Sequence, residues 1–392
     1  MSGVTKHIYE RDIIDINVMW NKELKEIEKI LPRTYGDDDI LLLLKKYYPH
    51  EWNSVEYKKI YYDKKDKFLI KRYGKARYKM PCAEKLLRQN GKYKQILSED
   101  TKNNHRDFFD ESVCKYNADA LWEKRRKKIS RIDTKIEKAK SKTQTVTPAF
   151  LDQLMGLYDR KDTSQKDKVY IIYELMKYYN PTVIAFFFKI NDTELNRQLR
   201  EIAFKHLQSF NYEPRLRSQK YMQIHTKNKK RKEYLKKVYP NEVYNISHNP
   251  DELEYRIHNG KEQKIKTYDY FISHSSRDSK LVQSIINYEN SQGKNIFCDW
   301  INDYDYLKRK LVCEATLRVI EWRLQQSDAV IFVRTDNSLN SVWCKYELNY
   351  FAELKKPIYY LDKDKAENGD FTLYKYDKEE FMDPNYKQLV LM

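Results

Sequence analysis

Short apolar segments alternate with amphipathic, helix-length segments through the last third of this chain, and this alternation limits its fold more than any other feature. Strands are predicted at residues 268–273, 295–300, 329–334 and 358–361, and helices at 278–289, 311–325 and 342–354. Strands that alternate with helices of about 10–15 residues are typical of a parallel sheet with helices on both faces. We therefore expect an α/β domain over residues 266–392.

Polar and aromatic side chains stand where the predicted strands end. Ser273 and His274 follow the first strand, and Asp299 and Trp300 close the second. The functional crevice of an open parallel sheet lies outside the carboxyl ends of its strands. A site that uses these side chains is therefore expected at that edge of the sheet.

The first two thirds of the chain predict helices. Residues 1–145 are interpreted as a basic helical region and residues 146–245 as a helical bundle, a candidate sensor or regulatory domain. Its strongest helix is predicted from Glu194 to Phe210, with Asp192 or Thr193 as its cap, because the apolar residues there recur at helical spacing. Turn signals at Pro250 and Gly260 suggest a linker over residues 246–265. The whole is thus predicted to be a multi-domain protein.

The positive charge is concentrated in that helical part. The formal net charge is +17, yet only 18 of the 75 Lys and Arg fall after residue 265, against 20 of the 58 Asp and Glu. A field of this sign favours an anionic partner, either nucleic acid or an acidic protein. The alternative explanation is a biased genomic composition, which would give the same lysine-rich chain without any partner.

Several classes of protein are disfavoured by composition. The chain has eight Gly and neither G-x-G-x-x-G nor G-x-x-x-x-G-K-[ST], so a Rossmann redox enzyme or a P-loop ATPase is not expected. Five Cys without a C-x-x-C pair argue against a zinc ribbon or a disulfide framework, and no metal is expected. No apolar run approaches the ~20 residues of a membrane span, and the N-terminus lacks an apolar signal region. A cytoplasmic protein without membrane contact is the expectation.

Three motifs resemble those of the TIR (Toll/interleukin-1 receptor) domain, specifically the bacterial NAD-cleaving kind. They are YDYFISHSSRDS, CDWINDYDYLKRKLV and SDAVIFVRTDNSLNSVWCKYELNYF, in the order of the family. The resemblance implies a flavodoxin-like sheet, activation by TIR–TIR self-association and a role in bacterial defence against phage. Two departures stand out: no Gly lies between Gly293 and Gly369, and Tyr346 and Asn349 flank the family's glutamate.

The resemblance assigns Glu347 as the catalytic carboxylate of a reaction that splits the nicotinamide–ribose bond of NAD+. One carboxylate suffices chemically, because the cationic nicotinamide leaves as a neutral molecule and needs no general acid, unlike the leaving group of an ordinary glycoside. The remaining task is to stabilise the positive charge that develops on the ribose. Trp343 stands at i, i+4 to Glu347 and would share its helix face.

Six residues are predicted to contact NAD+, which is expected as the substrate with no metal: Ser273, His274, Asp299, Trp300, Arg309 and Trp343. Each has a simpler explanation as a turn, cap or solvated residue, and Glu347 itself could be an exposed helix carboxylate. Two other functions stay open. The domain could be a non-enzymatic TIR scaffold, or the basic region could bind nucleic acid and use TIR for self-assembly.

Overall fold

The computed structural model describes residues 4–212, 228–230, 233, 242–307, 312–377 and 386. The chain forms two compact units. Unit 1 combines Met1–Ala139 with Phe187–Glu242, and unit 2 combines Lys140–Phe186 with Val243–Met392. The predicted bundle over residues 146–245 is therefore divided between the units, because its two halves pack against different parts of the chain. None of the described helices is both long and apolar enough to cross a membrane.

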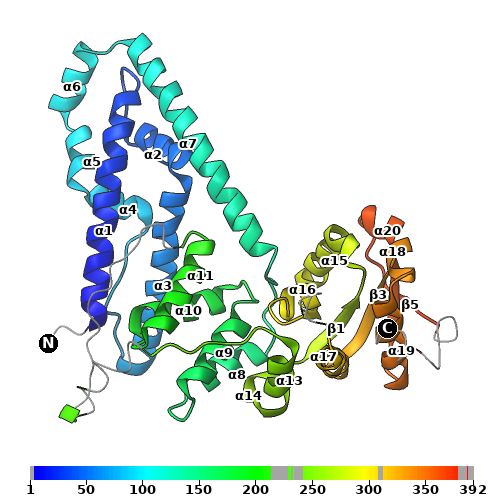
Figure 1. The fold of residues 1–392 in the computed structure, drawn as a ribbon. Helices are drawn as coiled ribbons and strands as arrows, with labels where there is room; N and C mark the ends of the chain where they lie inside the picture. The colour runs from blue at the N-terminus through cyan, green and yellow to red at the C-terminus, as the bar shows by residue number, and fades with distance from the viewer. Residues whose placement is uncertain are drawn as a thin grey trace. The chain divides into compact units, whose positions relative to one another are not determined.

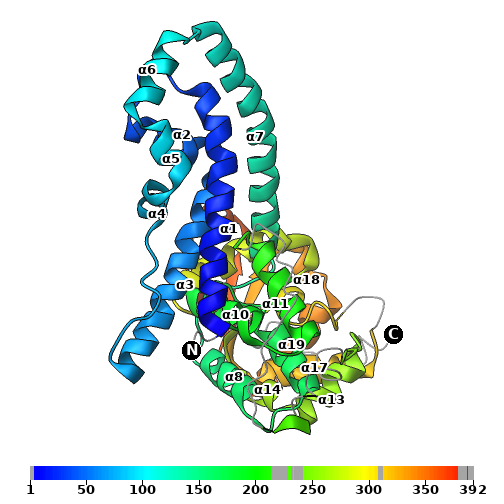
Figure 2. The same cartoon turned by 90° about the vertical axis from the view of Figure 1, so that its left-hand side faces the viewer.

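Unit 1 is helical, as the sequence predicts. Its long helices α1, α3 and α7 run beside one another (Figures 1 and 2). The aromatic pair Trp20–Trp52 joins α1 to α3, and the buried ion pair Arg125–Glu51 joins α7 to α3. The bounds of its helices are α1 Val4–Ile27, α2 Asp37–Tyr47, α3 Pro49–Tyr73, α4 Ala83–Gln89, α5 Gly91–Ile96, α6 Glu99–Asp107, α7 Glu111–Lys140 and α11 Arg197–Ser209, with η1 at Glu28–Ile30.

One predicted helix of this region divides differently. Helix α10, Pro181–Thr193, takes in the residues that were expected to cap its successor, and α11 begins at Arg197. Asn196 is the actual cap, and its side chain accepts a hydrogen bond from the backbone N–H of Leu199 at 3.2 Å. An amide at this position satisfies a helix N-terminus as well as the predicted Asp or Thr would.

Unit 2 contains a five-stranded sheet in the order β2-β1-β3-β4-β5. The first four strands pair in parallel and β5 is antiparallel to β4. This confirms the predicted flavodoxin-like α/β fold, with β5 as an additional edge strand. The strands are β1 Tyr268–Ser273, β2 Ile296–Phe297, β3 Ser327–Arg334, β4 Ile358–Asp362 and β5 Tyr374–Lys375.

Helices cover both faces of the sheet (Figure 1). Successive residues of β1 face opposite sides, as the pleat requires: Phe271 packs among side chains of α17 and α19, and Ile272 among those of α15. The connecting helices are η3 Ser276–Asp278, α15 Ser279–Ser291, α16 Asp299–Asn302, α17 Glu314–Gln325, α18 Asp336–Leu339, α19 Val342–Glu353 and α20 Lys363–Glu367. The second strand is shorter than predicted because α16 already begins at Asp299.

The remaining helices of unit 2 precede the sheet. They are α8 Phe150–Asp159, α9 Gln165–Leu175, α13 Pro250–Asn259 and α14 Lys261–Lys264. The stretch predicted as a linker, residues 246–265, thus forms two helices. Leu253 and Ile257 of α13 are buried against Val319 of α17, so this stretch is an integral part of unit 2.

Candidate functional site

Residues at two strand ends, together with residues of α17 and α19, line a pocket of about 270 Å³ in unit 2. Phe271 and His274 come from the end of β1, Asp299 from the start of α16, and Trp343 and Glu347 from α19. Strands β1 and β2 are parallel, so their carboxyl ends bring these side chains to one edge of the sheet. This is the crevice that such sheets use for ligands.

Glu347 lies half-buried in the pocket and is fixed by Ser273. The Ser273 hydroxyl, which is fully buried, donates a hydrogen bond of 2.6 Å to Oε2 of Glu347. Burial raises the pKa of Glu347 to about 8; the charge of Asp299 adds to the rise, and the Ser273 hydrogen bond opposes it. A carboxyl group with so high a pKa is a marker of functional sites. The structure thus brings together the two residues that the sequence placed at the first strand end and on the third helix.

The two ring nitrogens of His274 each have a partner. Its Nδ1 lies 3.1 Å from the carbonyl oxygen of Ile272, which can only accept a hydrogen bond. Its Nε2 lies 3.0 Å from the indole Nε1 of Trp300, which can only donate. The proton therefore sits on Nδ1. Asp299 Oδ1 lies 3.8 Å from the same Nε2.

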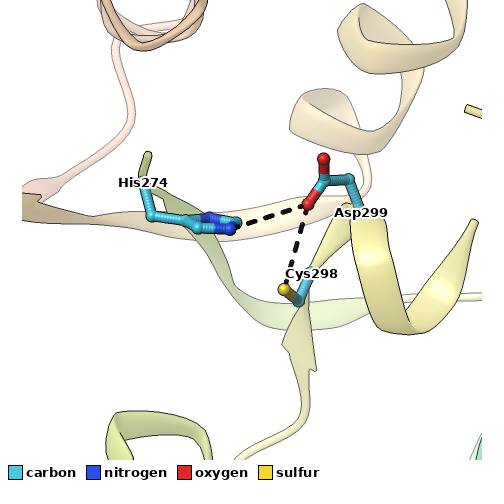
Figure 3. A group of neighbouring side chains, drawn as sticks. All are labelled: His274, Cys298 and Asp299. Carbon is cyan, nitrogen blue, oxygen red and sulfur yellow. Dashed lines mark hydrogen bonds and ion pairs between the residues drawn. The ribbon is translucent and has the colours of Figure 1, made fainter. Parts of the chain in front are cut away.

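His274, Cys298 and Asp299 form a group whose potential ligand atoms lie within 4.8 Å of one another (Figure 3). The group does not fit a metal ion. The Trp300 indole already occupies Nε2 of His274, and burial raises the pKa of Cys298 well above its ordinary value, which keeps the sulfur a thiol. Oδ1 of Asp299 already accepts a hydrogen bond from the backbone N–H of Trp300 at 2.8 Å, so all three potential ligand atoms are engaged within the protein.

Two of the predicted contact residues, Ser273 and Trp300, are not among the pocket's lining residues. Ser273 is fully buried and bonds Glu347, which does line the pocket. Trp300 supports His274 from behind. Arg309 lies outside the described residues. Sequence reasoning missed two lining residues: Arg277, an exposed side chain on η3, and Ser341, the N-cap of α19. The basic residue in the first motif, SHSSRDS, was a signal that could have found Arg277.

A doubly wound sheet, parallel in its first four strands, with a half-buried carboxylate at its strand ends on helix α19, is the arrangement of a TIR domain. Residues 271–368 match the family model described as the TIR-like domain of the Thoeris protein ThsB. A putative cyclic ADP-D-ribose synthase TIR2 of Cytobacillus dafuensis is 34% identical over 377 residues, covering 96% of each chain. The chain therefore belongs to the same family of bacterial TIR proteins as this relative.

Other relatives match a shorter part of the chain. A probable 3′ cyclic ADP-D-ribose synthase ThsB′ of Bacillus cereus (strain MSX-D12) is 31% identical over 119 residues, 30% of this chain and 59% of that protein. Toll-like receptor 2 of Bos indicus is 34% identical over 83 residues, 21% of this chain and 10% of the receptor. No solved structure matches the chain. The relative from Cytobacillus is thus similar to both units, whereas these two match less than a third of the chain.

Proposed function

We propose that this protein cleaves NAD+ at the nicotinamide–ribose bond and closes the remainder to a cyclic ADP-D-ribose. One observation carries the proposal: a half-buried carboxylate, Glu347, faces a pocket at the strand ends of a TIR domain. The name of the relative that matches across the full chain supports the cyclic product. The family further suggests that the reaction serves bacterial defence against phage.

The reaction needs one bond to break and one to form. The C1′–N1 bond of the nicotinamide riboside breaks, and its electron pair goes to nicotinamide, which leaves neutral. A nucleophilic atom elsewhere in the ADP-ribose then attacks C1′, and one proton is released to solvent. Positive charge develops on the ribose between these events, and the Glu347 carboxylate is placed to stabilise it.

Glu347 must be ionised for this role, and substrate binding favours that state. The free side chain has a pKa of about 8, so much of it is protonated at neutral pH. A cationic nicotinamide ring in the pocket lowers the pKa of a neighbouring carboxyl group. The Ser273 hydrogen bond acts in the same direction. We infer that Ser273 is a positioning residue which holds the carboxylate and favours its charge.

Other pocket residues suit other parts of NAD+. Trp343 offers an aromatic wall beside the carboxylate for the nicotinamide or the ribose. The Arg277 guanidinium at the rim suits the pyrophosphate, for which the chain has no glycine cradle. Asp299 at the start of α16 can accept hydrogen bonds from ribose hydroxyls. Arg309 stays a prediction for the pyrophosphate.

The product tests the proposal. Purified protein incubated with NAD+ is expected to release nicotinamide and an equal amount of a cyclic ADP-ribose that resists further hydrolysis, as seen by chromatography and mass spectrometry. A cyclic product has the mass of ADP-ribose less one water. Nicotinamide with linear ADP-ribose alone would contradict cyclisation. No nicotinamide at any protein concentration would favour the non-enzymatic scaffold.

The partners are proposed on separate grounds. Self-association through the TIR domain is proposed to complete or activate the site, as the family resemblance implies. The anionic partner of the basic residues 1–265 also remains a prediction. Its densest basic run, residues 227–237, lies mostly outside the described residues. Salt-dependent binding of DNA or RNA by the full chain would favour that reading, and binding unchanged by salt would oppose it.

A further inference from the structure

Five charged side chains are buried together in unit 2, beneath the pocket segment formed by α16 and the turn after it, residues 299–307. Glu174 comes from α9 and Lys177 from the residues just after it, Lys266 precedes β1, Asp303 follows α16, and Arg323 lies on α17. Four of these residues have an exposed fraction of 3% or less, and the Lys177 side chain is 12% exposed. We call this group the buried network.

Short hydrogen bonds and ion pairs connect the side chains of the buried network to one another. Arg323 binds Asp303 through both carboxylate oxygens, at 2.7 and 3.2 Å. Glu174 accepts hydrogen bonds from Lys177 and Lys266, each at 2.9 Å. Gln263 joins the two halves, because its amide N–H donates to Glu174 at 3.0 Å and its oxygen accepts from Arg323 at 2.8 Å. Lys177 lies 3.6 Å from Asp303 and makes the direct link between α9 and the pocket segment.

Both carboxylates of the network are ionised. Burial would raise the pKa of Asp303, yet Arg323, Lys266 and Lys177 outweigh it and hold that pKa below its ordinary value. The same balance lowers the pKa of Glu174. Buried pairs of this kind seldom add much stability over apolar packing, but they fix geometry when every partner is present. Geometry is therefore the property to examine.

The buried network holds the pocket segment through Asp303, which lies near the middle of that segment. Asp303 accepts backbone hydrogen bonds from Tyr306 and Leu307 at 2.9 Å each, and its own N–H donates to Asp299 at 2.9 Å. Asp299 and Leu307, at the two ends of this segment, both line the candidate active-site pocket. A shift of the Asp303 side chain would therefore move two walls of the pocket.

Asn302, the residue before Asp303, is also contacted by a side chain from residues 140–186. The side-chain amide of Gln144 donates to Oδ1 of Asn302 at 3.3 Å. Asn302 in turn accepts from the backbone N–H of Cys298 at 2.8 Å, just before the pocket segment begins. Gln144 and Lys177 both belong to residues 140–186, upstream of the sheet, and they hold consecutive residues at the end of α16.

We propose that Asp303, Arg323 and Lys177 are positioning residues, through which residues 140–186 set the shape of the NAD+ pocket. The pocket's use for NAD+ rests on the proposed function, but the mechanical coupling does not. These upstream residues then act as a built-in part of the enzyme. A displacement of only about 1 Å in a substrate-positioning group can reduce the rate on the order of 10²-fold.

The test compares two variants with a matched control in the full-length protein. Lys177→Met removes the link from α9 and leaves two cations facing two carboxylates, so the fold should persist. Asp303→Asn removes the anchor itself. The control is Arg318→Gln, on the same helix as Arg323 but in an exposed pair with Glu254. Hydrogen exchange of the Asp303, Tyr306 and Leu307 amides and the KM for NAD+ are measured for each.

Both network variants are expected to speed exchange of those three amides by at least about tenfold and to raise KM about tenfold while kcat changes less. The control should match the wild type. In the double variant Lys177→Met/Asp303→Asn, the effects on exchange and on KM should be less than additive, because both substitutions remove the same Lys177–Asp303 contact. Unchanged exchange in residues 299–307 for folded Lys177→Met would overturn the proposal. Since exchange needs no turnover, an inactive wild type would count against the proposed function alone.

Discussion

At the residue scale, the account depends on the protonation of one carboxyl group. Glu347 has a pKa of about 8 because it is buried near Asp299, and Ser273 is its hydrogen-bond donor. The reaction requires the ionised form. The folded-state pKa lies above the ordinary value of 4.5. The enzyme should therefore gain activity as pH rises, while the stability of the folded protein should fall.

The pH profile of kcat/KM for NAD+ should therefore rise through a limb near pH 8, which reports the free enzyme. The limb of kcat should lie at lower pH, because the bound nicotinamide cation favours the carboxylate. Ser273→Ala removes a donor to the charged form, so it should move the kcat/KM limb to higher pH and lower kcat/KM by roughly 10–100-fold at pH 7. A profile that is flat from pH 6 to 9 in the wild type would refute this assignment.

Thermal unfolding gives a second residue-scale prediction. The ionised carboxyl of Glu347 destabilises the folded state above pH 8, and this cost disappears as pH falls towards the unfolded value of 4.5. Glu347→Gln should therefore unfold at a higher temperature than wild type at pH 9, and the gap should shrink at pH 5. A gain of ~1 kcal/mol corresponds to about 2–4 °C. Equal gaps at both pH values would mean that Glu347 does not titrate as described.

At the element scale, the edge strand β2 shows how residues outside the sheet complete the fold. Ile296 has its backbone N–H bound by the Gln144 side-chain oxygen at 3.2 Å, and its carbonyl is bound by the Gln144 amide nitrogen. A side chain thus takes the place that a neighbouring strand would have. The Gln144 side chain therefore supplies hydrogen bonds to the outer edge of this two-residue strand.

Gln144→Ala should leave two buried backbone groups of Ile296 without partners. Each such group costs about 1–3 kcal/mol, so chemical denaturation should show a loss of roughly 2 kcal/mol or more. Gln144→Glu keeps the acceptor oxygen and should lose less if its carboxyl is protonated, at pH 4 rather than pH 8. A midpoint for Gln144→Ala equal to that of wild type would show that water replaces the amide without cost.

Sequence patterns predicted the elements better than their contacts. The alternation of segments was sufficient for the parallel sheet, and the third motif for Glu347. The bond between Ser273 and Glu347 joins residues 74 apart, and nothing in local spacing indicates it. The buried network escaped prediction because a charged helix residue such as Arg323 is normally solvated, and its partners Asp303 and Gln263 lie 20 and 60 residues away in the sequence. The linker prediction at residues 246–265 was wrong because Leu253 and Ile257, at i, i+4, had more weight than the turn residues.

At the scale of the whole molecule, two units share one chain, and the relative from Cytobacillus matches across both. This shared length favours a function that needs the helical unit as well as the TIR domain. If self-association activates the site, the specific activity should rise with protein concentration. The total rate should then increase more steeply than the enzyme concentration. Nicotinamide release per mole of protein over a hundredfold dilution series, beside light scattering, measures this. Constant specific activity with a constant monomer mass would exclude activation by assembly.

The most direct measurement of the central claim is nicotinamide release by the wild type and by Glu347→Gln, at equal protein concentration and pH 8. Glu353→Gln on the same helix α19 is the matched control, since that carboxylate is exposed and outside the pocket. We predict a loss on the order of 10²–10³ in kcat for Glu347→Gln and wild-type rates for the control. Full activity in Glu347→Gln, with the fold intact, would contradict the claim that this carboxylate performs the chemistry.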